Sequence, residues 1–91
     1  ILDPLVTGLI GDAYSESQDY KNAADFYKKA ADKSKNSYTT PLFLKKLGLV
    51  YEALEDNKSA EAAYNTIKTD YPESQEANLI DGPLNRVKAK Q

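Results

Sequence analysis

The sequence predicts an all-α fold: a solenoid of two helical hairpins followed by a C-terminal capping helix, five helices in all. Apolar residues recur at helical spacing along the chain, one segment returns after 37 residues, and polar loops separate the copies. The 91 residues have room for one small domain or for one slice of a longer repeat array. We therefore expect one hairpin at residues 1–37, a second at 38–74 and the capping helix at 75–91.

The repeated segment is centred on Gly11 and Gly48. In both copies a tyrosine follows the glycine after three residues, an alanine after twelve and a second tyrosine after sixteen. We expect each glycine to lie where the two helices of its hairpin approach most closely, because a side chain there would hold them apart. The repeat-defining core positions are Ile10, Gly11, Tyr14, Ala23, Tyr27 and Ala30 in the first copy, and Leu47, Gly48, Tyr51, Ala60, Tyr64 and Pro72 in the second.

The first hairpin opens with Asp3 and Pro4, an N-cap and a proline at the first helical position. Its first helix has an apolar stripe at helical spacing, formed by Val6, Leu9, Ile10, Ala13 and Tyr14. Asp19 precedes a second helix that is rich in alanine, which lets two helices pack closely. The contact face of this helix is formed by Tyr20, Ala23, Ala24, Tyr27, Ala30 and Ala31.

The second hairpin repeats these features after the polar loop at 34–37. Thr40 and Pro41 are expected to start its first helix, and Asp56 precedes its second. The stripe of the first helix consists of Phe43, Leu47, Val50, Tyr51 and Leu54, and the contact face of the second of Ala60, Ala63, Tyr64 and Ile67. The segment 70–74 ends the hairpin.

The tail is expected to form one amphipathic helix that starts at the N-cap Ser74. Its apolar residues at helical spacing are Ala77, Ile80, Leu84 and Val87. Pro83 lacks the N–H that would bond to Leu79, so we expect a kink or a short break there. Because the helix has no second-helix partner and ends in a basic turn, we expect it to act as a terminal cap.

Composition excludes most kinds of catalytic chemistry. The chain has no histidine and no cysteine, so it cannot form a Ser-His-Asp or Cys-His nucleophile, a zinc site or a disulfide. Asp12, Glu16 and Asp19 lie close in sequence, but nothing around them predicts the desolvation that shifts a carboxyl pKa. We therefore expect no enzyme, no catalytic residue, no metal and no cofactor.

Nucleic acid and direct membrane contact are not expected either. The formal charge is only −2, and the lysines around Lys28 alternate with Asp25 and Asp32 in a mixed-charge face. The tyrosines occupy helix-contact positions of the repeat instead of a stacking platform. No apolar run approaches the roughly 20 residues that span a bilayer.

The second copy resembles the tetratricopeptide repeat, a family of paired helices with a 34-residue period. The matching residues are Leu44, Leu47, Gly48, Tyr51, Ala60, Tyr64 and Pro72. The first copy resembles it more loosely, with Thr7 at the bulky position, Ile10 for leucine and no closing proline. The resemblance implies a non-catalytic module that binds a protein or peptide partner. The alternative is a structural role, as the capping end of a longer array or as a homodimerisation unit.

In this family the outward faces of the first helices line a concave groove. The resemblance implies a groove formed by Leu5, Gly8, Asp12 and Ser15 in the first repeat and by Leu42, Lys45, Leu49 and Glu52 in the second. Leu42 and Leu49 beside Lys45 make a candidate peptide anchor; alternatively, the final helix covers them. A clamp for a C-terminal carboxylate is not expected, because Leu49 replaces the asparagine that such members use.

The segment 71–74, an alanine after it and a final amphipathic helix are similar to periplasmic tetratricopeptide proteins of Gram-negative bacteria. Residues 39–46 resemble the C-terminal part of a Bacteroides-type protein, whose repeats follow a transmembrane helix. This resemblance implies a membrane-anchored parent protein and a location on the periplasmic side of the inner membrane, with a cytoplasmic location as the alternative. The opening residues Ile1, Leu2, Leu5, Val6 and Leu9 are too apolar for a terminal surface. We therefore expect more helices before them in the parent protein, or self-association through the first helix.

Overall fold

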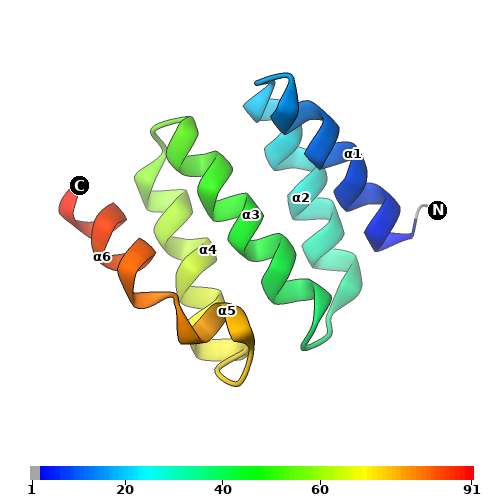
Figure 1. Ribbon diagram of the computed structural model, residues 1–91. Helices are drawn as coiled ribbons and strands as arrows, with labels where there is room; N and C mark the ends of the chain where they lie inside the picture. The colour runs from blue at the N-terminus through cyan, green and yellow to red at the C-terminus, as the bar shows by residue number, and fades with distance from the viewer. Residues whose placement is uncertain (1–2) are drawn as a thin grey trace.

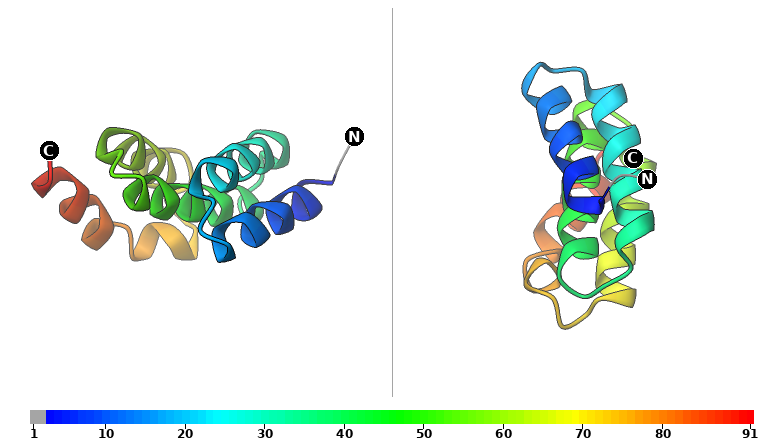
Figure 2. Two further views of the ribbon diagram at one scale, coloured as in Figure 1. Left: turned by 90° about the horizontal axis from the view of Figure 1, so that it is seen from above. Right: turned by 90° about the vertical axis from the view of Figure 1, so that its right-hand side faces the viewer.

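The computed structural model describes residues 3–91, and of Ser34 only the backbone; Ile1 and Leu2, named above, lie outside the described residues. The described chain folds into six helices and no strands (Figure 1). They are α1 (Pro4–Glu16), α2 (Tyr20–Ser34), α3 (Thr39–Ala53), α4 (Asn57–Asp70), α5 (Gln75–Asn78) and α6 (Asp81–Ala89). The predicted all-α class of helical hairpins is confirmed. The helices form one curved row, with α1 at one end of the row and α6 at the other (Figure 2).

Each helix packs mainly on its neighbours in sequence. The main contacts join α1 to α2, α2 to α3 and α3 to α4, and α6 then packs on α4. The short helix α5 contacts both α3 and α4. Hairpins α1–α2 and α3–α4 are therefore stacked through α2 and α3, and the tail closes the far side of the second hairpin.

Both hairpins use the same turn. Gln18 and Glu55 adopt the left-handed conformation with φ of 64° and 61°. The backbone N–H groups of the next residues, Asp19 and Asp56, each donate to a carbonyl five residues back at 2.9 Å. This arrangement satisfies carbonyls that the end of a helix would otherwise leave unpaired. The carboxylates of Asp19 and Asp56 then cap α2 and α4 by accepting from the third residue on, at 3.3 and 3.2 Å.

The start of α3 differs from the expectation. Thr40 is not the N-cap, because α3 already begins at Thr39. The N-cap is Tyr38, and the side-chain acceptor lies two residues before it: Oδ1 of Asn36 accepts from the backbone N–H of Tyr38 at 2.9 Å and of Thr39 at 2.8 Å. The Thr40 hydroxyl instead accepts from the backbone N–H of Asn36 at 2.8 Å. The polar loop between the hairpins therefore caps the helix that follows it.

The core consists of the faces between neighbouring helices. One cluster joins the hairpins and contains Ala23, Ala24, Tyr27, Leu47, Val50 and Ala63. A second joins the second hairpin to the tail and contains Ala60, Tyr64, Ile67, Ile80, Leu84 and Val87. A third, smaller cluster consists of Ala30, Ala31 and Phe43. The small alanines of α2 and α4 leave room for the large side chains of the helices that pack on them.

The glycines permit the close approach of large rings. A Cβ added at Gly11 would lie 2.8 Å from ring carbons of Tyr27, and one at Gly48 would lie 2.3 Å from Cε1 of Tyr64. Both distances are shorter than van der Waals contact, so these helices pack in this way only around glycine. The third such position, Gly8, meets Phe43 of the next hairpin, where the added Cβ would lie 2.2 Å from the ring.

Two expected stripes are only partly buried. On α1 the buried residues are Thr7, Gly8 and Gly11, whereas Val6 and Leu9 are 44% and 64% exposed. Ala13 is exposed as well, and Leu54 of the second hairpin is 36% exposed. Pro72, expected among the core positions, lies exposed in the α4–α5 loop. Val6, Leu9 and Ala13 stay exposed because no described element packs on the outer side of α1.

The tail forms two short helices instead of the single helix expected. The break lies at Leu79–Ile80, before Pro83 and not at it. Pro83 is in the first turn of α6, where its missing N–H removes no intrahelical bond. The break lets α5 lie against α3 and α4 while α6 turns Ile80, Leu84 and Val87 onto α4, where all three are buried.

Candidate partner-binding surface

The surface predicted to bind a partner lies on α1 and α3. Leu5, Leu42 and Leu49 keep 55%, 36% and 46% of their surface exposed. Ser15 and Lys45 are half-buried. Gly8 is buried under Phe43 and cannot form part of an accessible groove, which corrects that expectation.

Asp12 is bound by two partners within the fold, and its side chain stays 33% exposed. Nζ of Lys46 on α3 lies 2.9 Å from one carboxylate oxygen of Asp12 and 3.1 Å from the other. The Tyr27 hydroxyl donates a hydrogen bond to the same carboxylate. The Lys46 ammonium also lies 5.9 Å from the centre of the Tyr27 ring, within cation–π range. Burial raises the pKa of Tyr27, and the hydrogen bond to Asp12 raises it further.

Glu52 is held in the same manner. Arg86 on α6 donates from two guanidinium nitrogens to the two carboxylate oxygens of Glu52, both at 2.8 Å. The Tyr64 hydroxyl donates to Glu52 at 2.6 Å, and the Glu52 side chain is only 11% exposed. The hydrogen bonds from Arg86 lower the pKa of Glu52 more than burial raises it. Burial raises the pKa of Tyr64, and Glu52 raises it further.

These two networks change the interpretation of the predicted groove. Asp12 and Glu52 were expected to face a partner, but both join a buried tyrosine of their own hairpin to a cation of the next element. The acid and its cation are 34 residues apart in both networks. Acid–cation pairs separated by 34 residues were therefore the sequence signal that could have identified these contacts.

The remaining surface is apolar. We define the first-helix surface as Leu5, Leu42, Lys45 and Leu49. Helix α6 reaches the second hairpin through Arg86 but leaves Leu42 and Leu49 exposed, so the alternative in which the final helix covers these leucines is not what the structure shows. The first-helix surface thus combines three leucines with one lysine.

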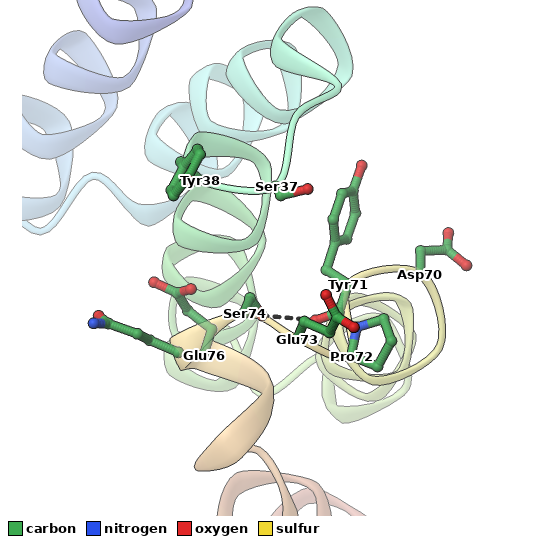
Figure 3. Close-up of a pocket in the computed structure, with 9 residues that line it drawn as sticks. Ser37, Tyr38, Asp70, Tyr71, Pro72, Glu73, Ser74 and Glu76 are labelled. Carbon is green, nitrogen blue, oxygen red and sulfur yellow. Dashed lines mark hydrogen bonds between the residues drawn. The ribbon is translucent and has the colours of Figure 1, made fainter.

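A separate hollow of about 620 Å³ lies between the α2–α3 loop and the α4–α5 loop (Figure 3). Among the residues that line the hollow, the Ser74 hydroxyl donates to the carbonyl of Tyr71 at 2.8 Å. Tyr38, which also lines the hollow, is 86% exposed. The carboxylates of the hollow belong to Asp70, Glu73 and Glu76. The sequence did not predict this hollow, because it forms where two loops from different hairpins meet.

Neither a metal site nor a membrane-spanning helix is found among the described residues. Among residues 3–91, no three His, Cys, Asp or Glu side chains are grouped so that they could hold a metal ion. None of the described helices combines the length and the apolar character that crossing a bilayer requires.

Each of the two hairpins is matched by a protein-family model. One model described as a tetratricopeptide repeat matches residues 8–37, and another with the same description matches residues 46–74. The chain belongs to the tetratricopeptide repeat family. Comparison with curated proteins and with solved structures finds no significant match. Tetratricopeptide repeats generally mediate protein–protein interactions and generally serve as non-catalytic scaffolds.

The two matched tetratricopeptide repeats contain α1–α2 and α3–α4, and the tail lies outside both matches. The tail nevertheless joins the repeat before it through an ion pair, although Asp12 and Glu52 occupy different positions of the 37-residue repeat. Arg86 of α6 bonds Glu52 of the second repeat, as Lys46 of the second repeat bonds Asp12 of the first.

Proposed function

We propose that this tetratricopeptide repeat protein binds a protein or peptide partner, without catalysis, through the first-helix surface. The observation that carries the proposal is that Leu5, Leu42 and Leu49 remain exposed on adjacent first helices. Exposed large apolar side chains grouped on one surface are typical of interaction sites.

The chemistry of the surface selects the kind of partner. Because Asp12 and Glu52 are neutralised within the fold, the surface has little negative charge for a basic partner to pair with. Burying one leucine contributes about 1.5–3 kcal/mol, and the entropy cost of association reduces the total for three. A partner with apolar side chains and one acidic group for Lys45 fits best.

The proposal is tested with peptides selected from a display library on the immobilised chain. We expect the variant Leu42→Glu/Leu49→Glu to weaken binding at least about tenfold, or about 1.4 kcal/mol. The matched control is Leu54→Glu/Leu79→Glu, which makes the same change at leucines outside the first-helix surface. Far-UV circular dichroism must show the same helicity for both variants.

The alternative is a structural cap or homodimerisation unit with no ligand of its own. Failure to select any peptide, or equal binding by both double variants, would favour this alternative. The periplasmic location and the membrane-anchored bacterial parent stay predictions of the sequence resemblance, with the cytoplasm as the alternative.

A further inference from the structure

The hollow between the α2–α3 loop and the α4–α5 loop has an unbalanced negative charge. Asp70, Glu73 and Glu76 line it, and none of its nine lining residues is a lysine or an arginine. The ion pairs formed among residues 3–91 all involve other carboxylates. The chain therefore neutralises Asp12 and Glu52 but leaves the carboxylates of the hollow without a cation.

The end of α4 adds to the negative potential of the hollow. Asp70 is the last residue of α4 and Tyr71 is its C-cap, so the hollow adjoins the C-terminal end of a helix of 14 residues. A helix has partial negative charge at this end, which attracts cations. The opposing dipole of α5 is weak, because α5 has only four residues and Ser74 caps its start. Both contributions favour a cationic occupant.

Two tyrosines offer aromatic faces beside these carboxylates. Tyr38 comes from the α2–α3 loop and is 86% exposed, and Tyr71 comes from the α4–α5 loop and is half-buried (Figure 3). A guanidinium is planar, so it stacks on an aromatic ring and still donates to carboxylates from its edge. An ammonium is a compact charge with no flat face to stack. The combination of tyrosines and carboxylates therefore favours arginine over lysine.

The hollow is too large for a single ion to fill. Its volume of about 620 Å³ lies within the range of about 300–1,000 Å³ that is typical of ligand pockets. Among residues 3–91 no three acidic side chains are grouped so that they could hold a metal ion, so the carboxylates of the hollow are spread along its walls. An occupant that reaches both the tyrosines and these carboxylates has the length of a short peptide segment.

Hydrogen bonds fix both walls of the hollow. On one side Oδ1 of Asn36 accepts from the backbone N–H of Tyr38 at 2.9 Å. On the other side the Ser74 side chain is buried, and its hydroxyl donates to the carbonyl of Tyr71 at 2.8 Å and accepts from the backbone N–H of Ala77 at 3.1 Å. A ligand that enters a preformed site of this kind does not have to order the loops around it.

We propose that this hollow binds an extended, arginine-containing segment of a partner protein. The guanidinium stacks on the exposed ring of Tyr38 and donates to the carboxylates of Glu73 and Glu76. The site is separate from the first-helix surface, because no residue of that surface lines the hollow. The two sites also select opposite charges, since the first-helix surface has a lysine and the hollow has acids.

The arginine has to come from a different protein and not from a second copy of the chain. Arg86 is the only arginine among the 91 residues. Its guanidinium already donates to both carboxylate oxygens of Glu52 at 2.8 Å. The exposed cations at the end of α6 are Lys88 and Lys90, which lack the planar group that stacks on tyrosine.

The test measures the binding of three dye-labelled peptides to the full 91-residue chain by fluorescence anisotropy at low salt, where charge screening is weak. The first peptide is Gly-Arg-Gly-Arg-Gly, the second has lysine in place of arginine, and the third has citrulline, which keeps the shape of arginine without its charge. We expect the arginine peptide to bind, the lysine peptide to bind at least about threefold more weakly, and the citrulline peptide to show no binding.

Substitutions in the hollow locate the binding site. Tyr38→Ser removes the aromatic face and places a favoured residue at the N-cap of α3, so the fold is kept. We expect it to weaken the arginine peptide about threefold and the lysine peptide less. Glu73→Gln/Glu76→Gln should weaken both peptides about fivefold or more. The matched control Asp25→Asn/Asp32→Asn removes the same charge from exposed positions outside the hollow and should change both affinities less than about twofold.

Several results would overturn the proposal. They are no binding of the arginine peptide at about 1 mM, equal binding of the arginine and lysine peptides, or an equal loss in the control and in Glu73→Gln/Glu76→Gln. A chain that light scattering shows to be a dimer which Glu73→Gln/Glu76→Gln dissociates would also overturn it, because the occupant would then be a second copy. None of these variants changes the first-helix surface, so the proposed function is tested separately.

Discussion

Because Gly48 has a hydrogen atom in place of a side chain, the Tyr64 ring of α4 can pack directly against α3. The Tyr64 ring that lies against it is fully buried, and its hydroxyl is fixed by Glu52. The ring therefore cannot move aside for a methyl group. At Gly11 the clash with Tyr27 is milder, because the added Cβ would lie 2.8 Å away instead of 2.3 Å.

We predict that Gly48→Ala destabilises the fold by about 1–3 kcal/mol through overpacking, reduced by up to about 1 kcal/mol because alanine favours helix. Gly11→Ala should cost less. Urea unfolding of both variants measures the difference, and Lys21→Ala, at an exposed helical position, serves as the control. If Gly48→Ala were as stable as the parent, the packing of Tyr64 on α3 described here would be incorrect.

The ion pair of Glu52 gives a pH dependence with a defined sign. Its pKa is lowered in the folded state, chiefly by Arg86, so the folded chain binds fewer protons than the unfolded chain as the pH falls. The contribution of Glu52 is therefore fully present above the unfolded pKa of about 4.3 and is lost as the pH falls through the folded pKa.

We expect Glu52→Gln to reduce stability by about 1–2 kcal/mol at neutral pH, since it weakens a charge-assisted hydrogen bond. The difference from the parent should shrink as the pH is lowered below about 4.3. Denaturant titrations at several pH values measure it. A difference that stayed constant across this range would show that the charge of Glu52 does not stabilise the fold.

At the scale of the element, the turn inside each hairpin uses a residue that is poorly suited to it. Gln18 and Glu55 have positive φ, which glycine adopts without the steric cost of a Cβ. We predict that Glu55→Gly stabilises the chain by about 0.5–1 kcal/mol. Glu55→Ala, which keeps a Cβ, should give no gain, so a thermal melt of the two variants separates backbone strain from loss of the charge.

The elements also show which parts of the fold local sequence could predict. The Asp19 and Asp56 caps and the repeated glycines act within one hairpin, so the hairpins followed from the sequence. The ends of the tail helices did not, because the break at Leu79–Ile80 depends on how Ile80 meets α4. The exposure of Leu42 and Leu49 was one of two alternatives that only the packing of α6 could separate.

The same reasoning applies to the candidate site. Helical spacing could place Leu5, Leu42 and Leu49 on the outward faces of the first helices, but not decide whether α6 covers Leu42 and Leu49. The engagement of Asp12 and Glu52 depends on cations 34 residues away in the sequence. Reasoning from one helix at a time therefore assigned both carboxylates to a partner.

For the whole molecule, the tail is as important as either hairpin. Ile80, Leu84 and Val87 are almost fully buried and cover Tyr64 and Ile67 of α4. Burial of three such side chains corresponds to about 5–9 kcal/mol as an upper estimate. This amount is comparable to the total stability of a small domain.

We predict that ending the chain after Asn78 abolishes cooperative thermal unfolding and leaves a partly helical, aggregating species. Removing only Lys90 and Gln91, which are exposed, should lower the Tm by a few degrees at most. Calorimetry of the two truncated chains makes the comparison. A cooperative transition in the shorter chain would mean that two repeats are stable without α6.

The contact of each helix with its neighbours along the chain has a consequence for folding and for local opening. Contacts of this kind are short-range in sequence, so the chain has a low contact order and should fold on a fast timescale. Stability in such a chain is a sum over neighbouring units, and opening starts at an end instead of everywhere at once. Because the buried residues of α1 are only Thr7, Gly8 and Gly11, α1 should open first, and its amides should exchange with solvent deuterium before those of α3.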